Sequence, residues 1–178
     1  MFVGFIAIIV VLLIIVAAMS TGSTSGSGGV DQTQATKVLS EFSGLTQSFD
    51  FYKTTTTLSD YEGISVPNLV KNGIVNTADT ADAGNDGLAG TTDDVTPAVN
   101  NDFIVSKALD GVTYTVAPDA NTNAKKVTTV TIAGLVSDSA ADAIASTLTS
   151  KLASSATVVS DGLHDNANGK AGTITITE

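Results

Sequence analysis

Residues 1–19 of the chain are continuously apolar. They read MFVGFIAIIVVLLIIVAAM, and the first charged side chain along the chain is Asp31. As a helix this segment would extend roughly 28 Å at about 1.5 Å per residue, close to the roughly 30 Å of a bilayer's hydrocarbon core. The pattern therefore predicts an apolar helix over residues 1–20, suited to a membrane or to the centre of a packed assembly.

Two other interpretations of this apolar segment stay open. A secretory signal peptide normally begins with Lys or Arg and has a shorter apolar run that ends in a cleavage motif, and neither feature is present. A plain membrane anchor normally carries Lys or Arg on its cytoplasmic side, and that flank is also absent. The missing basic flank favours a mature chain from which a basic leader has been removed.

A connector and a second helix are predicted after the apolar segment. Residues 21–29 are rich in Gly and Ser, so we predict an extended connector, although the same composition is typical of a disordered linker. Over residues 30–53, apolar side chains recur at intervals of four and three, which is typical of one helix face. This face consists of Val38, Phe42, Leu45, Phe49 and Tyr52. Asp31 is the expected N-cap, and the β-branched run 54–57 is expected to end the helix.

The rest of the pattern predicts short helices and strands. A helix is expected to start near Pro67 and to end at Gly73, followed by a polar loop over residues 76–102. A further amphipathic helix is expected over residues 137–153. Alternating apolar positions predict strands over 112–116, 130–132, 157–159 and 173–177.

The order of these elements predicts an α+β fold. The last two strands are expected to pair around the loop 160–172, and the amphipathic helix 30–53 is expected to pack on a small antiparallel β-sheet. The predicted organisation is therefore an apolar helix over 1–20, a connector over 21–29 and one head domain over 30–178.

Composition excludes several classes of function. Eighteen acidic residues against eight basic ones give a net charge of -10. A nucleic-acid-binding protein needs a basic surface along the phosphate backbone, so no nucleic-acid partner is expected. Because the chain has no cysteine, it has neither a disulfide nor a thiolate ligand or nucleophile. With one histidine and no Gly-rich phosphate-binding loop that ends in Lys, no enzymatic activity is expected.

An acidic loop is the strongest candidate for chemistry. Its acidic positions are Asp82, Asp86, Asp93 and Asp94. The first three fall at the first, fifth and twelfth positions of an EF-hand-like loop, with Gly87 at the sixth. Gly84 stands at the third position and supplies no side-chain ligand, and no flanking helices are predicted. Oxygen ligands on Gly-rich turns suit Ca²⁺, so calcium is one expectation; the alternative is a solvated loop without a metal.

A weaker cluster of oxygen ligands lies in the loop before the last predicted strand. It comprises Asp161, Asp165, Asn166 and Asn168. These side chains offer the same chemistry at looser spacing, so they form a second, weaker calcium candidate. The single histidine, His164, lies in the same loop and is expected to be an exposed loop residue.

The order of the segments resembles a type IV pilin. The resemblance is carried by the uncharged N-terminal helix, the amphipathic helix that continues it, a Gly-Val-Pro-like segment near residue 66, and the C-terminal sheet. The strand–helix–strand arrangement near residues 127–159 is most similar to the type IVb branch. The resemblance covers the whole chain in architecture, but in sequence only its first 20 residues.

The resemblance implies a structural filament subunit. Such a subunit is stored in the inner membrane, extracted by an ATP-driven assembly machinery, and joined to a homopolymeric filament at the cell surface. The apolar helices then bundle in the filament core, which replaces the lipid as an apolar environment. The residues expected in that core are Met1, Phe2, Phe5, Ile8, Ile9, Leu12, Leu13, Ile15 and Val16.

The chain departs from the family pattern in three ways. Most pilins carry a glutamate at the fifth mature position, which pairs with a neighbour's N-terminal amine, whereas this chain has Phe5. The family's proline near position 22 is absent, and the common C-terminal disulfide cannot form. A divergent bacterial pilin, an archaeal pilin and a pseudopilin of a secretion system therefore stay open. A membrane-anchored extracellular module that binds Ca²⁺ or a partner is a further alternative.

Overall fold

The computed structural model of the chain describes residues 27–56, 60–82, 100–133, 136–161, 164–168 and 170–178. The chain divides into two compact units, Met1–Val30 and Asp31–Glu178. The predicted apolar helix over residues 1–20, with all its predicted core residues, lies outside the described part. Within that part, no helix combines the length and the hydropathy needed to cross a bilayer.

The amphipathic helix is longer than predicted at both ends. Helix α2 spans Ser27–Thr56, so it begins inside the predicted connector, and Asp31 lies within the helix instead of capping it. Glycine is tolerated at helix N-termini, which is consistent with a start in the Gly-Ser segment. At the other end the helix includes threonines that were expected to stop it. The hydroxyls of Thr55 and Thr56 donate to the Tyr52 carbonyl at 3.0 and 2.6 Å, which ties these side chains to the preceding turn.

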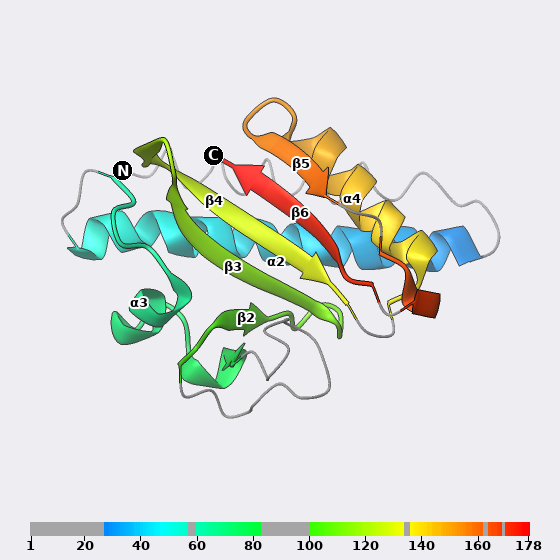
Figure 1. Cartoon of the computed structure of the whole chain (residues 1–178), viewed down its shortest axis with the longest axis horizontal. Coiled ribbons are helices and arrows are strands. Elements are labelled where there is room, and N and C mark those ends of the chain that lie inside the picture. Colours follow the sequence, from blue (N-terminus) through cyan, green and yellow to red (C-terminus); the bar gives the residue numbers. More distant parts are fainter. Residues whose placement is uncertain (1–26, 57–59, 83–99, 134–135, 162–163, 169) are drawn as a thin grey trace, which may run out of the picture. The chain divides into compact units, whose positions relative to one another are not determined.

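A six-stranded antiparallel sheet forms the other half of the fold, in the order β1-β2-β3-β4-β6-β5 (Figure 1). The strands are β1 Thr80–Ala81, β2 Phe103–Val105, β3 Val112–Asp119, β4 Thr122–Ile132, β5 Thr157–Asp161 and β6 Gly172–Thr177. All four predicted strands are confirmed, and β5 pairs with β6 as expected. The strands β1 and β2 were not predicted, because they are too short to show a period of two.

The short elements between α2 and β2 correct the predicted polar loop. Helix α3 spans Val66–Lys71, close to its predicted position, with Ser65 as its N-cap. The loop expected from residue 76 instead begins with the 3-10 helix η1, Thr77–Asp79, followed directly by β1. The Asn76 side chain accepts a hydrogen bond from the Ala78 N–H at 3.0 Å, and this cap starts the 3-10 turn.

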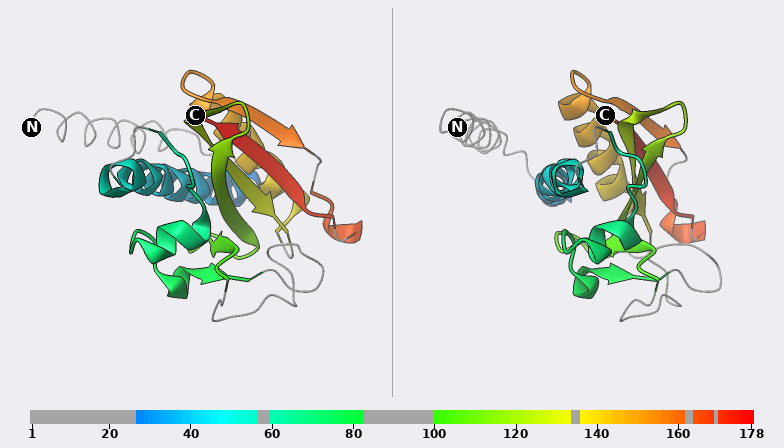
Figure 2. Two further views of the ribbon diagram at one scale, coloured as in Figure 1. Left: turned by 60° about the vertical axis from the view of Figure 1, so that its left-hand side comes forward. Right: turned by 90° about the vertical axis from the view of Figure 1, so that its left-hand side faces the viewer.

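Helices α2 and α4 cover the same face of the sheet (Figure 2). Helix α4 spans Asp138–Leu152, and its N-cap Ser137 accepts from the Ala140 N–H. The buried apolar face of α2 comprises Ala35, Val38, Leu39, Phe42, Phe49 and Tyr52. It packs toward sheet residues such as Tyr114 and Ile176, so the predicted α+β fold, with a helix on an antiparallel sheet, is confirmed.

The opposite face of the sheet is rich in threonine. Strand register places Thr115, Thr129 and Thr175 next to one another on adjacent strands, and Thr113, Thr131 and Thr173 form a second row. Threonine is β-branched and polar, so it favours a strand; Thr113 on this face is buried, whereas Thr115, Thr129, Thr131, Thr173 and Thr175 are half-exposed. This alternation explains why the C-terminal half of the chain is polar and still forms a sheet.

Replacement of Gly111 by alanine is expected to lower the free energy of unfolding by about 2 kcal/mol. Gly111 has a φ of +83°, and a Cβ atom there would lie 2.3 Å from the Ala133 carbonyl oxygen. The matched control is Gly73→Ala, because Gly73 has a φ of +68° but no atom within 4 Å of such a Cβ. We expect about 1 kcal/mol for the control, from backbone strain alone. Denaturant unfolding of both variants measures this, and equal losses would contradict the steric argument.

Candidate functional site

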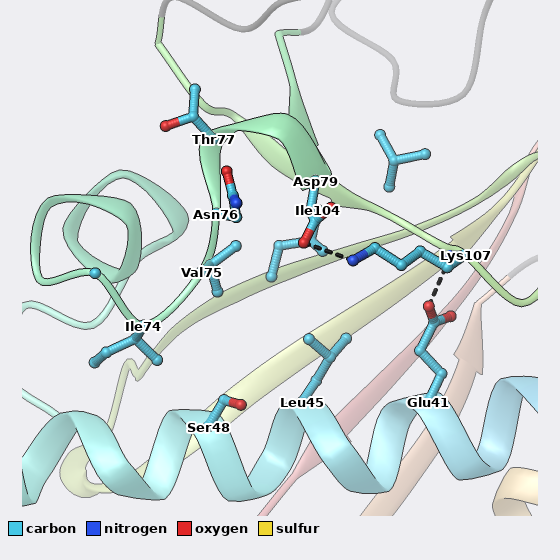
Figure 3. A pocket seen from close by; sticks show the side chains of 12 residues that line it. Glu41, Leu45, Ser48, Ile74, Val75, Asn76, Thr77, Asp79, Ile104 and Lys107 are labelled. Carbon is cyan, nitrogen blue, oxygen red and sulfur yellow. Dashed lines mark hydrogen bonds and ion pairs between the residues drawn. The ribbon is translucent and has the colours of Figure 1, made fainter.

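A cleft of about 600 Å³ lies between the middle of α2, the segment after α3, and β2 (Figure 3). Its apolar lining consists of Leu45, Ile74, Val75, Ile104 and Val105. Its polar lining includes Glu41, Ser48, Asn76, Thr77, Asp79 and Lys107. Gly73, with its positive φ, ends α3 and lets the following residues run along the side of the cleft opposite α2.

An ion pair and a bound carboxylate close one end of this cleft (Figure 3). Lys107 Nζ lies 2.7 Å from Asp79 Oδ2. The Lys107 backbone N–H donates to Glu41 Oε1 at 2.7 Å, and the Tyr114 hydroxyl donates to Glu41 Oε2 at 2.8 Å. The Ser106 hydroxyl also donates to Glu41 Oε2. Glu41 on α2 is therefore hydrogen-bonded to the residues that follow β2 and to Tyr114 on β3.

The tyrosine in this arrangement stays protonated. Burial raises the pKa of Tyr114 far above its usual value, and the negative charge of Glu41 and the hydrogen bond to it raise the pKa further. The protonated Tyr114 hydroxyl donates its hydrogen bond to the Glu41 carboxylate. The Glu41–Tyr114 contact is thus structural support for the cleft.

The chemistry of the cleft suits binding of an apolar side chain. Glu41 accepts three hydrogen bonds and Asp79 is paired with Lys107, so the described acids of the cleft are already engaged. Across the described ranges, no group of three or more His, Cys, Asp or Glu side chains is placed to bind a metal ion. A concave surface with an apolar floor and a polar rim is typical of a binding site.

A second polar cluster surrounds Lys126, which is buried although it is charged. Lys126 Nζ lies 2.9 Å from Asp50 Oδ1 and 3.2 Å from Glu178 Oε2. The Tyr61 hydroxyl donates to Asp50 Oδ1 at 2.6 Å. Backbone hydrogen bonds of 3.1 Å in both directions join Lys126 to Glu178. The cluster therefore links α2, the segment before α3, β4 and the last residue.

Burial and charge act on Lys126 in opposite directions. Burial alone would lower the pKa of its ammonium group, but the hydrogen bond to Asp50 and the negative charges of Glu178 and Asp50 raise the pKa above its usual value. Lys126 was not predicted from the sequence as a site residue. The alternation of side chains along β4 could have indicated that it is buried, because Lys126 lies on the same inward face of the strand as Thr128, Val130 and Ile132.

Asp82 is the one predicted calcium ligand of the acidic loop that falls within the described ranges. It is buried, and its Oδ1 accepts from the Asn100 and Asn101 N–H groups at 2.8 and 2.6 Å. The other predicted ligands, Asp86, Asp93 and Asp94, lie outside the described residues. Asp82 thus joins the residues on the two sides of the acidic loop, and calcium binding by this loop stays a prediction.

The second predicted cluster is partly described. Asp165 accepts from the backbone N–H of Asn168 at 3.2 Å and from its side-chain Nδ2 at 2.7 Å. Asp161 ends β5 and its side chain, like that of Asn166, is not described. The structure therefore brings Asp165 and Asn168 together in an internal turn, and a metal at this cluster also stays a prediction.

His164 corrects the prediction of an exposed loop residue. It is only 7% exposed, and its Nδ1 lies 2.8 Å from Oδ1 of Asp138 in the first turn of α4. Close backbone approach explains the burial: a Cβ atom on Gly172 would lie 2.9 Å from the His164 nitrogen. The glycine lets the loop lie tightly against β6 so that the imidazole fits beside α4.

Acid titration is expected to remove the contribution of Asp165 to stability. Hydrogen bonds from the Asn168 side chain and then from its backbone lower the pKa of Asp165 below its usual 3.8. The Asp165 carboxylate therefore binds a proton less tightly in the folded state than in the unfolded state. The contribution is present above about pH 3.8 and is lost as the pH falls through the lower folded value. Carboxyl NMR titration should show the pKa of Asp165 rise in Asn168→Ala, and an unchanged pKa would contradict the assignment.

Comparisons of the chain with protein families, with curated proteins and with solved structures found no match. The function of the chain is therefore inferred from its sequence pattern and from the geometry of the described head.

Proposed function

We propose that this chain is a structural subunit of a type IV pilus-like extracellular filament that polymerises through its apolar segment, residues 1–19. The observation that carries the proposal is the absence of any charge before Asp31 in a chain whose net charge is -10. Such a segment is stable in lipid, and it leaves lipid readily only for another apolar environment. A bundle of identical segments in a filament core is that environment.

The attachment of α2 to the head supports this proposal. Phe42 and Phe49 bury α2 in the core, and Glu41 and Asp50 join it to the sheet through polar contacts. A helix attached at several points along its length can transmit force from an N-terminal segment to the head without detaching. That property is required of a subunit that is extracted from a membrane and then placed under tension in a filament.

The proposed partners and location follow from this role. The subunit resides in the inner membrane before assembly, is handled there by pilus assembly machinery, and ends in a homopolymer at the cell surface. Phe5 replaces the acid that pairs with a neighbour's amine in most pilins. Contacts between heads must then contribute to the alignment of subunits.

Electron cryo-microscopy of filaments sheared from the source cells tests the proposal. We expect a polymer of this chain alone, with residues 1–19 bundled at its centre. A matched pair of variants sharpens the test: Ile8→Asp places a charge in the expected core, whereas Thr149→Asp places the same charge on the exposed face of α4. The first should abolish filaments and the second should preserve them. A chain that stays monomeric in the membrane fraction would instead favour the anchored extracellular module.

A further inference from the structure

We draw no further inference here: the strongest candidate, the cleft between α2, residues 73–79 and β2, carries none because nothing in the structure shows what covers it.

Discussion

Phe49→Ala is expected to lower the free energy of unfolding by roughly 3–5 kcal/mol, whereas Phe51→Ala is expected to change it by less than about 0.5 kcal/mol. The two residues lie two positions apart on α2, but Phe49 is completely buried and Phe51 is 55% exposed. Truncation of Phe49 removes buried apolar area and leaves a cavity between α2 and the sheet. Truncation of Phe51 removes a ring that is mostly in water in the isolated head.

Denaturant unfolding of the detergent-solubilised full chain, followed by circular dichroism, measures both changes. The pair is internally controlled, because both substitutions are the same chemical change in the same helix. Similar losses at the two positions would mean that the buried face of α2 is assigned incorrectly.

Lys126→Met is expected to lower the free energy of unfolding by roughly 2–4 kcal/mol. The substitution keeps an unbranched side chain of similar length but removes the charge that Asp50 and Glu178 share. Removing one partner of a buried ion pair leaves the other charges with poor hydration, which is the main source of the loss. The value lies below the largest losses for buried pairs because the Asp50 side chain is 51% exposed and water can partly replace its partner.

Lys125→Met is the control for this effect. Lys125 is adjacent in sequence but exposed, so its replacement should change the free energy of unfolding by less than about 0.5 kcal/mol. The pH dependence provides a further check. The pKa of Lys126 is raised in the folded state. The contribution of its charge to the free energy of unfolding is therefore complete below pH 10.5, and it is lost as the pH rises through the higher pKa of the folded state. If Lys126→Met lost as much stability at alkaline pH as the natural chain does, this role of Lys126 would be contradicted.

Local pattern predicted the regular elements well because each one repeats its own period. The stripe on α2 and the amphipathic pattern of α4 are properties of neighbouring residues, and the structure confirms both helices. Gly73 likewise marks the end of α3 with a positive φ. The weakest predictions concerned boundaries: α2 starts at Ser27 because a Gly-Ser segment, which would not form a helix by itself, is continuous with a helix that is packed on a sheet.

The candidate site could not be predicted from the sequence in the same way. Glu41, Asp79, Ile104 and Lys107 are far apart along the chain, and they meet only because β2 pairs with β3 under α2. Leu45 was predicted as part of the buried stripe, but it is half-buried and lines the cleft. The periodicity showed that Leu45 lies on the face toward the head, but not that the packing there is incomplete.

By itself the sequence determined the apolar segment 1–19, the α+β class of the head, the absence of thiol chemistry and the acidic character of the surface. These are properties of composition and of local period. Only the tertiary structure decided that Lys126 and His164 are buried, that Asp82 joins the residues on the two sides of the acidic loop, and that a cleft lies between α2, residues 73–79 and β2. The physical reason is that burial, ion pairing and concavity depend on which distant segments meet, and this is determined by strand pairing and by the close approach that glycines such as Gly172 permit.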